Sequence, residues 1–263
     1  MKKNNPPSKA ELKNFLAVAW LAAHKGGQRS LKYFRKDVSV IKKIDKTPVT
    51  RADREGEVVI RGVLSKAFPE HQLCGEEFGW DKDHNPDYKW WIDPVDGTRQ
   101  FIRGLPFWGT LLGLEYKGEV IAGVMHHPAI NLTLWAGKGM GCYANGKRVH
   151  VSKINKLENG TLTYGGMRRV SKEKYGPKFT KLLQSCFDDR SFGDSFGHAL
   201  VCQGMVEANL DPEVKPYDVA PIKICVEEAG GIFTDIKGNK SIYNGTGLST
   251  NGLVHNQVLK TTR

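Results

Sequence analysis

Residues 91–98 read Trp91-Ile92-Asp93-Pro94-Val95-Asp96-Gly97-Thr98, and this stretch decides the fold prediction. Apolar residues lead into it from Trp90, and the helical pattern Arg99-Gln-Phe-Ile-Arg103 leads out of it. We therefore expect a strand that ends in two carboxylates and turns through glycine into a helix. Such an end offers oxygen ligands for Mg²⁺ and free N–H groups for an anion. Taken alone, Asp96 or Thr98 is equally well explained as a helix N-cap.

The chain before this motif predicts two helices and a short strand. Ser8-Lys-Ala-Glu11 is a capping box ahead of an amphipathic helix, which Gly26-Gly27 is expected to end or interrupt. A strand over 37–44 and a turn at 45–48 follow, and a second helix opens at Arg51. The apolar face of this second helix is expected to consist of Val58, Val59, Val63, Leu64 and Phe68.

Strand pairs dominate the chain after the motif. Residues 107–116 and 119–125 predict an antiparallel hairpin, and Asn145-Gly146 is the strongest hairpin-turn signal of the chain. Gly137-Lys-Gly139-Met-Gly141 resembles a nucleotide loop superficially, but it lacks the full glycine spacing and a following helix. We expect no contact with phosphate there.

From about residue 150 the pattern changes to alternating strands and helices. Strands are expected at 162–164, 189–192 and 206–210, with 232–235 as the final core strand. The predicted helices are 172–186, 196–203, and one that follows Lys215-Pro-Tyr217-Asp218, with Pro221 in its first turn and Gly230-Gly231 at its end. The change of pattern divides the chain into an N-terminal part, 1–150, and a C-terminal part, 151–263.

The composition restricts the class of protein. Most of the formal charge of +11 lies in residues 1–51, which carry a net +10. Basic and aromatic residues mix in 31–36, but no nucleic-acid recognition signature accompanies them, so a solvated basic face explains the charge better. The five scattered cysteines never form a CxxC pair and no long apolar run occurs. Both features favour a cytoplasmic protein without disulfides or a membrane span.

Five acids stand where a strand ends or a helix begins: Asp53, Glu76, Asp93, Asp96 and Asp218. In an alternating strand and helix layout, such ends converge on one edge of a sheet. Carboxylates gathered there repel one another unless divalent cations hold them together. Because no His or Cys accompanies them, Mg²⁺ is expected, with Mn²⁺ as a possible substitute. Paired ions about 3.5–4 Å apart suit hydrolysis of a phosphate ester.

Three separated motifs carry a family resemblance: Gly75-Glu-Glu77, the Trp91–Thr98 stretch, and Tyr217-Asp218 followed by Glu228-Ala-Gly-Gly231. In this order they resemble the inositol monophosphatase family of Mg²⁺-dependent, lithium-sensitive phosphatases. The resemblance implies a layered αβαβα sandwich of the inositol monophosphatase and fructose-1,6-bisphosphatase type, usually a homodimer. Its sheet would be antiparallel in the N-terminal part and mixed in the C-terminal part. Tyr217 departs from the family's usual Trp, which should affect packing behind Asp218 more than the chemistry.

The resemblance also implies a role for each site residue. Glu76, Asp93 and the Val95 carbonyl would hold one Mg²⁺, and Asp93, Asp96 and Asp218 a second, with two or three ions per subunit. Thr98, oriented by Asp53, would position the attacking water, so that the catalytic residues would be Asp53, Thr98 and Glu76. The backbone N–H groups of Gly97 and Thr98 would bind the phosphate.

Within the family, four segments look most like the histidinol-phosphatase branch: 33–35, 46–53, 193–198 and 211–218. Histidinol phosphate carries an ammonium group and an imidazole, so its pocket should offer carboxylates that are not used for metal. Asp194 and Asp211 are the candidates, although either is also explained as a cap. Two alternatives stay open: a phosphatase for inositol 1-phosphate or another sugar phosphate such as fructose 1,6-bisphosphate, and a nucleic-acid-binding protein that uses the basic N-terminal region.

Overall fold

The computed structural model describes residues 6–36, 40–42, 48–81 and 85–262. The turn predicted at 45–48 lies outside these residues except for Pro48, which begins a strand. Of the strand predicted over 37–44, the described part is Val40–Lys42, and it is a strand.

The bounds of the elements are as follows. The helices are α1 (Lys9–Leu31), α2 (Arg51–Ala67), α3 (Thr98–Ile102), α4 (Met167–Val170), α5 (Gly176–Gln184), α6 (Asp194–Cys202), α7 (Pro216–Glu228) and α8 (His255–Thr262), with the 3₁₀ turns η1 (Pro128–Ile130) and η2 (Leu157–Asn159). The strands are β1 (Val40–Lys42), β2 (Pro48–Thr50), β3 (His71–Gly75), β4 (Gly79–Trp80), β5 (Asn85–Asp96), β6 (Gly109–Tyr116), β7 (Glu119–His127), β8 (Leu132–Gly137), β9 (Gly141–Ala144), β10 (Lys147–Val149), β11 (Thr161–Tyr164), β12 (Asp188–Arg190), β13 (Ala208–Pro212), β14 (Ile232–Thr234) and β15 (Thr246–Thr250).

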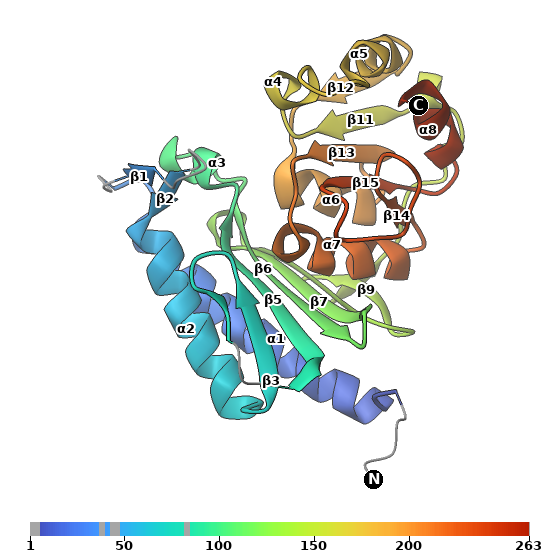
Figure 1. The fold of residues 1–263 in the computed structure, drawn as a ribbon. Coiled ribbons are helices and arrows are strands. Elements are labelled where there is room, and N and C mark those ends of the chain that lie inside the picture. The colour runs from blue at the N-terminus through green and yellow to red at the C-terminus, as the bar shows by residue number, and fades with distance from the viewer. Residues whose placement is uncertain (1–5, 37–39, 43–47, 82–84, 263) are drawn as a thin grey trace.

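The elements form five layers (Figure 1). Helices α1 and α2 cover one face of an eight-stranded sheet of order β10-β9-β8-β7-β6-β5-β3-β4. Helices α6 and α7 lie between this sheet and a five-stranded sheet of order β12-β11-β13-β15-β14. Helices α5 and α8 cover the outer face of the second sheet. The predicted αβαβα sandwich is confirmed.

The type of the first sheet differs from the prediction in one pair of strands. Most of its strands are antiparallel, but β3 and β5 run parallel, so the sheet is mixed. The parallel pair brings the carboxyl ends of both strands to the same edge, where the Glu76 N–H donates to the Ile92 carbonyl at 3.0 Å. The acids that follow these two strands therefore become neighbours. The second sheet is mixed, as predicted, because β11 runs parallel to β12 and β13, whereas β15 is antiparallel to β13.

Strand β5 is buried on both faces. Successive side chains of a strand point to opposite sides. Trp90 accordingly packs in the apolar cluster with α1 and α2, and Trp91 packs in the cluster with α7. Both indoles are at most 2% exposed. The strand that carries Asp93 and Asp96 is thus anchored on both sides before it reaches the edge of the sheet.

The two glycines of the first helix neither end nor interrupt it, because α1 continues to Leu31. Both glycines permit close packing instead. A Cβ on Gly26 would lie 2.5 Å from Ile60 Cγ1 of α2, and a Cβ on Gly27 would lie 2.7 Å from His126 Cδ2 of β7. The prediction was wrong because the close packing of α1 on α2 and β7 outweighs the helix propensity of about 1 kcal/mol that each glycine gives up.

Four further expectations need correction. The predicted apolar face of α2 is right in part, since Leu64 is buried and Val63 and Phe68 pack against the same cluster. Val58, however, is 57% exposed, and the buried positions also include Ala52, Gly56 and Ile60. The helix predicted over 172–186 is shorter than expected, because α5 spans only Gly176–Gln184, and the separate helix α4 ends at Val170, before the predicted range begins. Residues 232–234 are not the last strand, because β15 follows and pairs between β13 and β14. Its sequence, Thr-Gly-Leu-Ser-Thr, contains one large apolar residue and so gave little signal. Pro221, expected in the first turn of its helix, lies inside α7.

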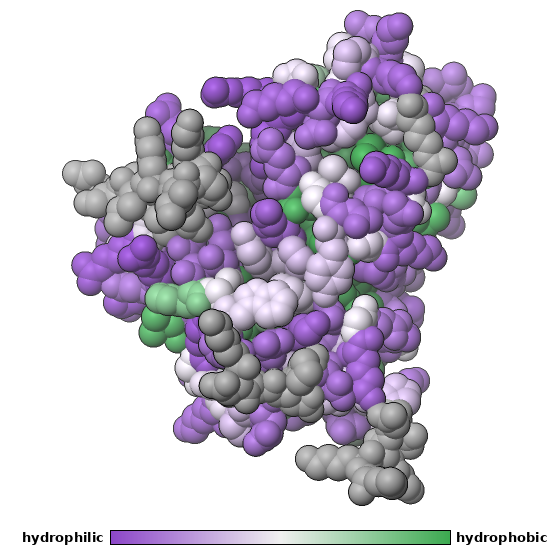
Figure 2. Space-filling model, viewed as in Figure 1, coloured by the Kyte–Doolittle hydropathy of each residue, from purple (hydrophilic) through white to green (hydrophobic). Residues whose placement is uncertain are grey.

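Two observations concern the surface. The face drawn in Figure 2 is mainly hydrophilic, with small and separate hydrophobic patches. Among the described residues, no helix combines the length and the apolar character that crossing a bilayer requires.

In the basic N-terminal region, the Phe34 ring packs against Phe101 and Trp108, with centroids 5.6 and 5.7 Å apart. This ring is used in an internal cluster and does not form an open stacking platform.

Candidate metal and phosphate site

A cavity of about 850 Å³ lies between the two parts of the chain. The end of β5 and helix α3 line one side of it, and α4, the start of α6 and the start of α7 line the other. All ten residues predicted for the site except Asp53 line this cavity: Glu76, Asp93, Val95, Asp96, Gly97, Thr98, Asp194, Asp211 and Asp218. Asp53 lies directly behind it, in contact with Thr98.

A β-bulge aims two carboxylates of β5 at one point. Asp93 pairs with Leu111 of β6 and Asp96 pairs with Gly109. The two aspartates are three residues apart on β5, whereas their partners are only two residues apart on β6, so β5 contains one extra residue. In a regular strand, residues three apart point to opposite faces. The extra residue at Pro94-Val95 cancels that alternation. The bulge therefore allows Asp93 and Asp96 to face the same cavity.

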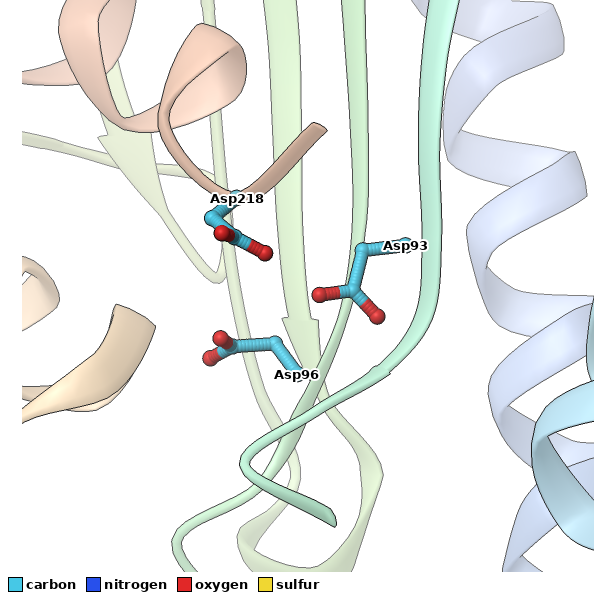
Figure 3. Close-up of side chains that lie close together, drawn as sticks. All are labelled: Asp93, Asp96 and Asp218. Carbon is cyan, nitrogen blue, oxygen red and sulfur yellow. The ribbon is translucent and has the colours of Figure 1, made fainter. Parts of the chain in front are cut away.

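Helix α7 supplies the third carboxylate (Figure 3). Pro216 occupies its first turn, and Asp218 accepts a hydrogen bond from the Lys215 backbone N–H at 2.6 Å. One oxygen from each of Asp93, Asp96 and Asp218 lies within 4.8 Å of one oxygen from each of the other two. The first two residues come from the N-terminal part of the chain and the third from the C-terminal part, so the site joins the two.

The three carboxylates are electrostatically unfavourable as anions. Burial and then the neighbouring Glu76 raise the pKa of Asp93 well above its usual range. Burial and then Asp194 raise the pKa of Asp96. Burial raises the pKa of Asp218 to about 7. Because a hard divalent cation stabilises the ionised forms and prefers carboxylate oxygens, this set of donors suits Mg²⁺ or Mn²⁺.

Asp53 is both a helix cap and a part of the site. It accepts the Thr50 backbone N–H at 2.8 Å as the second half of a capping box at the start of α2. Its other oxygen lies 3.3 Å from the Thr98 hydroxyl. That hydroxyl also lies 3.1 Å from the Val95 carbonyl. Since the hydroxyl has a single proton, it can donate to only one of these two acceptors at a time.

Glu57 positions Glu76, and the sequence analysis missed it. The Glu57 side chain is fully buried, accepts the Glu77 N–H at 2.8 Å and pairs with Arg61 at 2.7 Å. It lies so close to Gly75 that a Cβ there would be 1.8 Å from its Oε1. The turn that carries Glu76 is therefore built around the Glu57 carboxylate. A Glu within a helix carries no sequence signal for such a role.

The C-terminal side of the cavity is held by polar contacts across the two parts of the chain. The Ser195 N–H donates to Asp96 Oδ2 at 2.7 Å. Asp194 accepts hydrogen bonds from Gln100 of α3 and, at 3.0 Å, from Arg169 of α4. The Asp194 side chain is 14% exposed. It lies near the carboxylate cluster but is not one of its three members.

The glycine-rich loop at 137–141 binds a carboxylate of the same chain. The N–H groups of Gly139 and Gly141 each donate to Glu228 at 2.7 Å, and that of Met140 donates at 3.0 Å. Consecutive N–H groups of this kind form an anion-binding nest. Glu228 ends α7, so the loop fastens the helix of Asp218 to the first sheet. The expectation that it is no nucleotide loop agrees with this contact.

Without Mg²⁺, the protein is expected to lose stability as the pH rises from about 5 to about 8. An acid whose pKa is higher in the folded than in the unfolded state stabilises the fold below its unfolded pKa of about 3.9. That stabilisation is lost as the pH rises through about 6 for Asp53 and about 7 for Asp218. Thermal unfolding should therefore show that Mg²⁺ raises the Tm by about 5 °C more at the higher pH. An equal Mg²⁺ effect at both pH values would contradict this expectation.

Two curated proteins resemble this chain over most of its length. The histidinol-phosphatase of Chlorobaculum parvum is 38% identical over 237 residues, which cover 89% of this chain and 90% of that protein. The histidinol-phosphatase of Mycobacterium tuberculosis is 34% identical over 228 residues, which cover 85% and 87%.

Solved structures share the fold. The IMPase of Thermotoga maritima is 31% identical and superposes with a TM-score of 0.87, covering 95% of this chain and 96% of that one. An IMPase/NADP phosphatase solved with Mg²⁺ and phosphate is 20% identical, with a TM-score of 0.82 and coverage of 97% and 96%, which shows the fold alone. The sequence pattern of the inositol monophosphatase family matches residues 11–263. Together with the carboxylate cluster, these likenesses show that the chain belongs to the inositol monophosphatase family and is a metal-dependent phosphatase of that family.

Proposed function

We propose that this chain is a Mg²⁺-dependent phosphatase that hydrolyses L-histidinol phosphate. The observation that carries the reaction is the cluster of Asp93, Asp96 and Asp218 beside the Asp53–Thr98 contact. The similarity to histidinol-phosphatases, at 38% and 34% identity, supports the substrate.

The metal ligands are assigned as the resemblance implies. Glu76, Asp93 and the Val95 carbonyl would hold one Mg²⁺, and Asp93, Asp96 and Asp218 would hold a second. Bound Mg²⁺ lowers the pKa of a coordinated water and neutralises charge on the phosphoryl oxygens. Two or three ions per subunit, and Mn²⁺ as a substitute, are part of the same proposal. The parallel arrangement of β3 and β5 supports it, because it places the turn of Glu76 beside Asp93.

Thr98 would position the water that attacks phosphorus. When its hydroxyl donates to Asp53, the oxygen lone pairs can accept a hydrogen from that water, and the Val95 carbonyl becomes available as a ligand. The Gly97 and Thr98 N–H groups would bind the phosphate. Gly97 has φ = +79°, a left-handed conformation suited to glycine, and no side chain caps α3 among the described residues.

Asp194 would recognise the cationic part of the substrate. Its carboxylate faces the cavity from the side opposite β5, and Arg169 and Gln100 fix its orientation. Asp194→Ala is expected to raise KM for histidinol phosphate at least about tenfold more than KM for p-nitrophenyl phosphate, since a charge-assisted hydrogen bond contributes about 1.5–3 kcal/mol. Steady-state kinetics on both substrates measure this. An equal rise in KM for the two substrates would show that Asp194 does not recognise the cationic part of histidinol phosphate.

A sugar phosphate is the second candidate substrate. Three exposed arginines line the cavity mouth, Arg99, Arg103 and Arg168, and they would suit a second phosphate group. The Thermotoga maritima protein with 31% identity is an IMPase. The decisive experiment compares kcat/KM of the purified protein for histidinol phosphate, inositol 1-phosphate and fructose 1,6-bisphosphate in Mg²⁺. The first proposal predicts that histidinol phosphate is preferred at least about tenfold, and a preference for either sugar phosphate would replace it.

Several expectations stay predictions. These are the homodimer, the cytoplasmic location, inhibition by lithium and the absence of nucleic-acid binding. Size-exclusion chromatography with light scattering tests the first. The phosphate-ester assay with added lithium tests the third. A steep salt dependence of binding to duplex or single strands, without Mg²⁺-dependent phosphatase activity, would favour the nucleic-acid alternative.

A further inference from the structure

Asp211 lies at the floor of the cavity, with only 3% of its side chain exposed. Its Oδ2 is within hydrogen-bonding distance of His198 Nε2, at 3.1 Å, and of Asn209 Nδ2, at 3.2 Å. Its Oδ1 is buried beneath two glycines, because a Cβ on Gly165 would be 1.9 Å away and a Cβ on Gly193 would be 2.7 Å away. A substrate therefore meets the backbone of these glycines before it meets the carboxylate.

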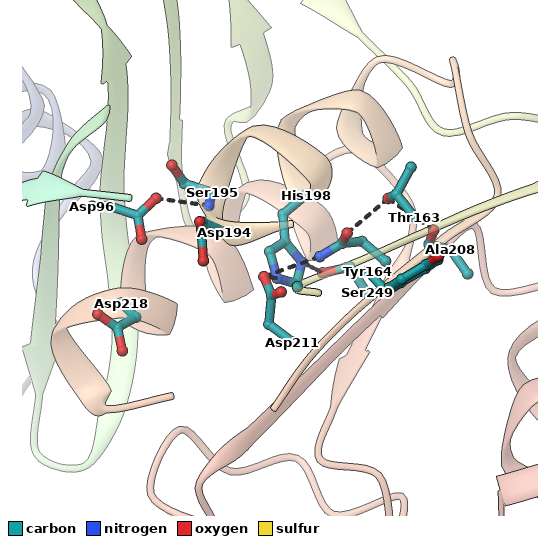
Figure 4. A network of polar contacts seen from close by, with 12 residues as sticks. Asp96, Thr163, Tyr164, Asp194, Ser195, His198, Ala208, Asp211, Asp218 and Ser249 are labelled. Atoms are coloured by element: carbon teal, nitrogen blue, oxygen red, sulfur yellow. Dashed lines mark hydrogen bonds and ion pairs between the residues drawn. The ribbon is translucent and has the colours of Figure 1, made fainter. Parts of the chain in front are cut away.

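His198 connects Asp211 to the centre of the second sheet (Figure 4). Its Nδ1 lies 2.6 Å from the Ser249 hydroxyl of β15, and the imidazole is fully buried. Since an ionised carboxylate can only accept, Nε2 carries the hydrogen of the contact with Asp211. The chain Ser249–His198–Asp211 has no nucleophilic role, because Ser249 is fully buried.

The same contacts fix the start of α6. Asp194 has φ = +58°, which costs a non-glycine residue about 1–2 kcal/mol and persists only where the surroundings hold it. Burial would raise the pKa of Asp211, but His198, followed by Arg169 and the Asp194 backbone N–H, holds it below its usual range. One turn further on, a Cβ on Gly197 would be 2.2 Å from Asn209 Oδ1, so α6 packs directly on β13.

We propose that His198 and Asp211 form a positioning pair, which holds the start of α6 so that Asp194 and Ser195 reach the site from it. Asp211 then acts on the substrate through these two residues and does not touch it. Asp194 faces the cavity, and the Ser195 N–H binds Asp96 of the carboxylate cluster. The pair therefore affects both substrate recognition and the metal ligands. Its effect on histidinol phosphate rests on the proposed function, whereas its effect on the metal site does not.

The test is a double-mutant cycle on the full-length protein with Mg²⁺. His198→Leu, Asp211→Ala, which removes the acceptor, and the double variant are assayed on histidinol phosphate and on p-nitrophenyl phosphate. Loss of one partner leaves a buried polar group unsatisfied, which costs about 1–3 kcal/mol, so each single variant should raise KM for histidinol phosphate about 5- to 100-fold. The KM of the double variant should not exceed that of the more strongly affected single variant, because both changes break the same contact.

The effect on metal binding is measured with p-nitrophenyl phosphate as the only substrate. His198→Leu should raise the half-saturating Mg²⁺ concentration several-fold through the Ser195–Asp96 contact. His198→Gln should restore most of the wild-type value, because its amide N–H₂ can donate to Asp211. His255→Gln is the matched control: this histidine is also buried between hydroxyls, of Thr234 and Thr250, but does not line the cavity. If His198→Leu does not fold, Ser249→Ala, which removes only the Nδ1 partner, should show a smaller rise in both constants.

The outcomes separate the two proposals. If Asp211→Ala raised KM strongly, His198→Leu raised it weakly and the two effects multiplied in the double variant, Asp211 would be a direct substrate contact and the pair would be overturned. Folded variants with wild-type KM and Mg²⁺ dependence would overturn it as well. If the wild type does not prefer histidinol phosphate, the proposed substrate is wrong. The Mg²⁺ dependence measured with p-nitrophenyl phosphate still decides whether the pair positions α6.

Discussion

The Asp93→Asn variant is expected to lose at least about a thousandfold in kcat/KM, which corresponds to about 4 kcal/mol of transition-state stabilisation. In the proposed site Asp93 is the one side chain shared by both Mg²⁺ ions. An amide removes its charge and leaves a single oxygen able to serve as a ligand. The fold should survive, because that oxygen can still accept the Val95 N–H that Asp93 Oδ1 accepts at 3.0 Å.

The measurements are steady-state kinetics and thermal unfolding with and without Mg²⁺. The variant should show a Tm at or above that of the Mg²⁺-free wild type, because it lacks one of the repelling buried charges, and no rise on adding Mg²⁺. Asp87→Asn is the matched control, because Asp87 lies on the same strand and makes an exposed ion pair with Lys117 at 3.7 Å. It should keep wild-type activity and the Mg²⁺ shift. Full activity of the Asp93→Asn protein would show that Asp93 is not a metal ligand.

The sequence predicted which residues line the cavity, but it did not predict how their side chains are arranged there. Asp93 and Asp96 could be recognised from their position after an apolar strand. Three residues apart on a regular strand, they would face opposite sides. The bulge that turns them to one cavity depends on the register between β5 and β6, as Asp96 pairs with Gly109. Register is a property of two strands, so the motif by itself could not reveal it.

For two acids, a role as a helix cap does not exclude a place at the candidate site. Asp53 caps α2 and contacts Thr98. Asp218 accepts an N–H at the start of α7 and is a member of the carboxylate cluster. Because a carboxylate has two oxygens and several lone pairs, one oxygen can fix the helix end while the other faces the cavity. A cap at the edge of a sheet is thus a rigid support for a ligand.

Residues that act through others could not be predicted. Glu57 and His198 lie within helices, are fully buried and contact the supports of the site, not the cavity centre. Their partners are distant in sequence, at 20 residues for Glu57 and Glu77 and 51 for His198 and Ser249. The same holds for the packing of Gly26 against Ile60. Such roles depend on tertiary contact, whereas periodicity and caps report only local structure.

Thr98→Ala is the second change with a large expected effect, and it separates water positioning from metal binding. The Thr98 hydroxyl has two acceptors nearby, Asp53 at 3.3 Å and the Val95 carbonyl at 3.1 Å. Removing it leaves the cluster of Asp93, Asp96 and Asp218 intact but takes away the group that would orient the attacking water. General-base assistance contributes about 10²–10⁴-fold. We therefore expect kcat to fall about a hundredfold or more.

The measurement that distinguishes the two roles is kcat together with the Mg²⁺ dependence of the Tm. Thr98→Ala should lower kcat while its Mg²⁺-induced Tm shift stays at the wild-type value. Thr98→Ser, which keeps the hydroxyl, should recover most of kcat. Wild-type kcat in Thr98→Ala would show that the water is positioned by another group. Loss of the Mg²⁺ shift would instead place Thr98 among the supports of the metal site, because the Val95 carbonyl and Asp53 would then depend on it for their positions.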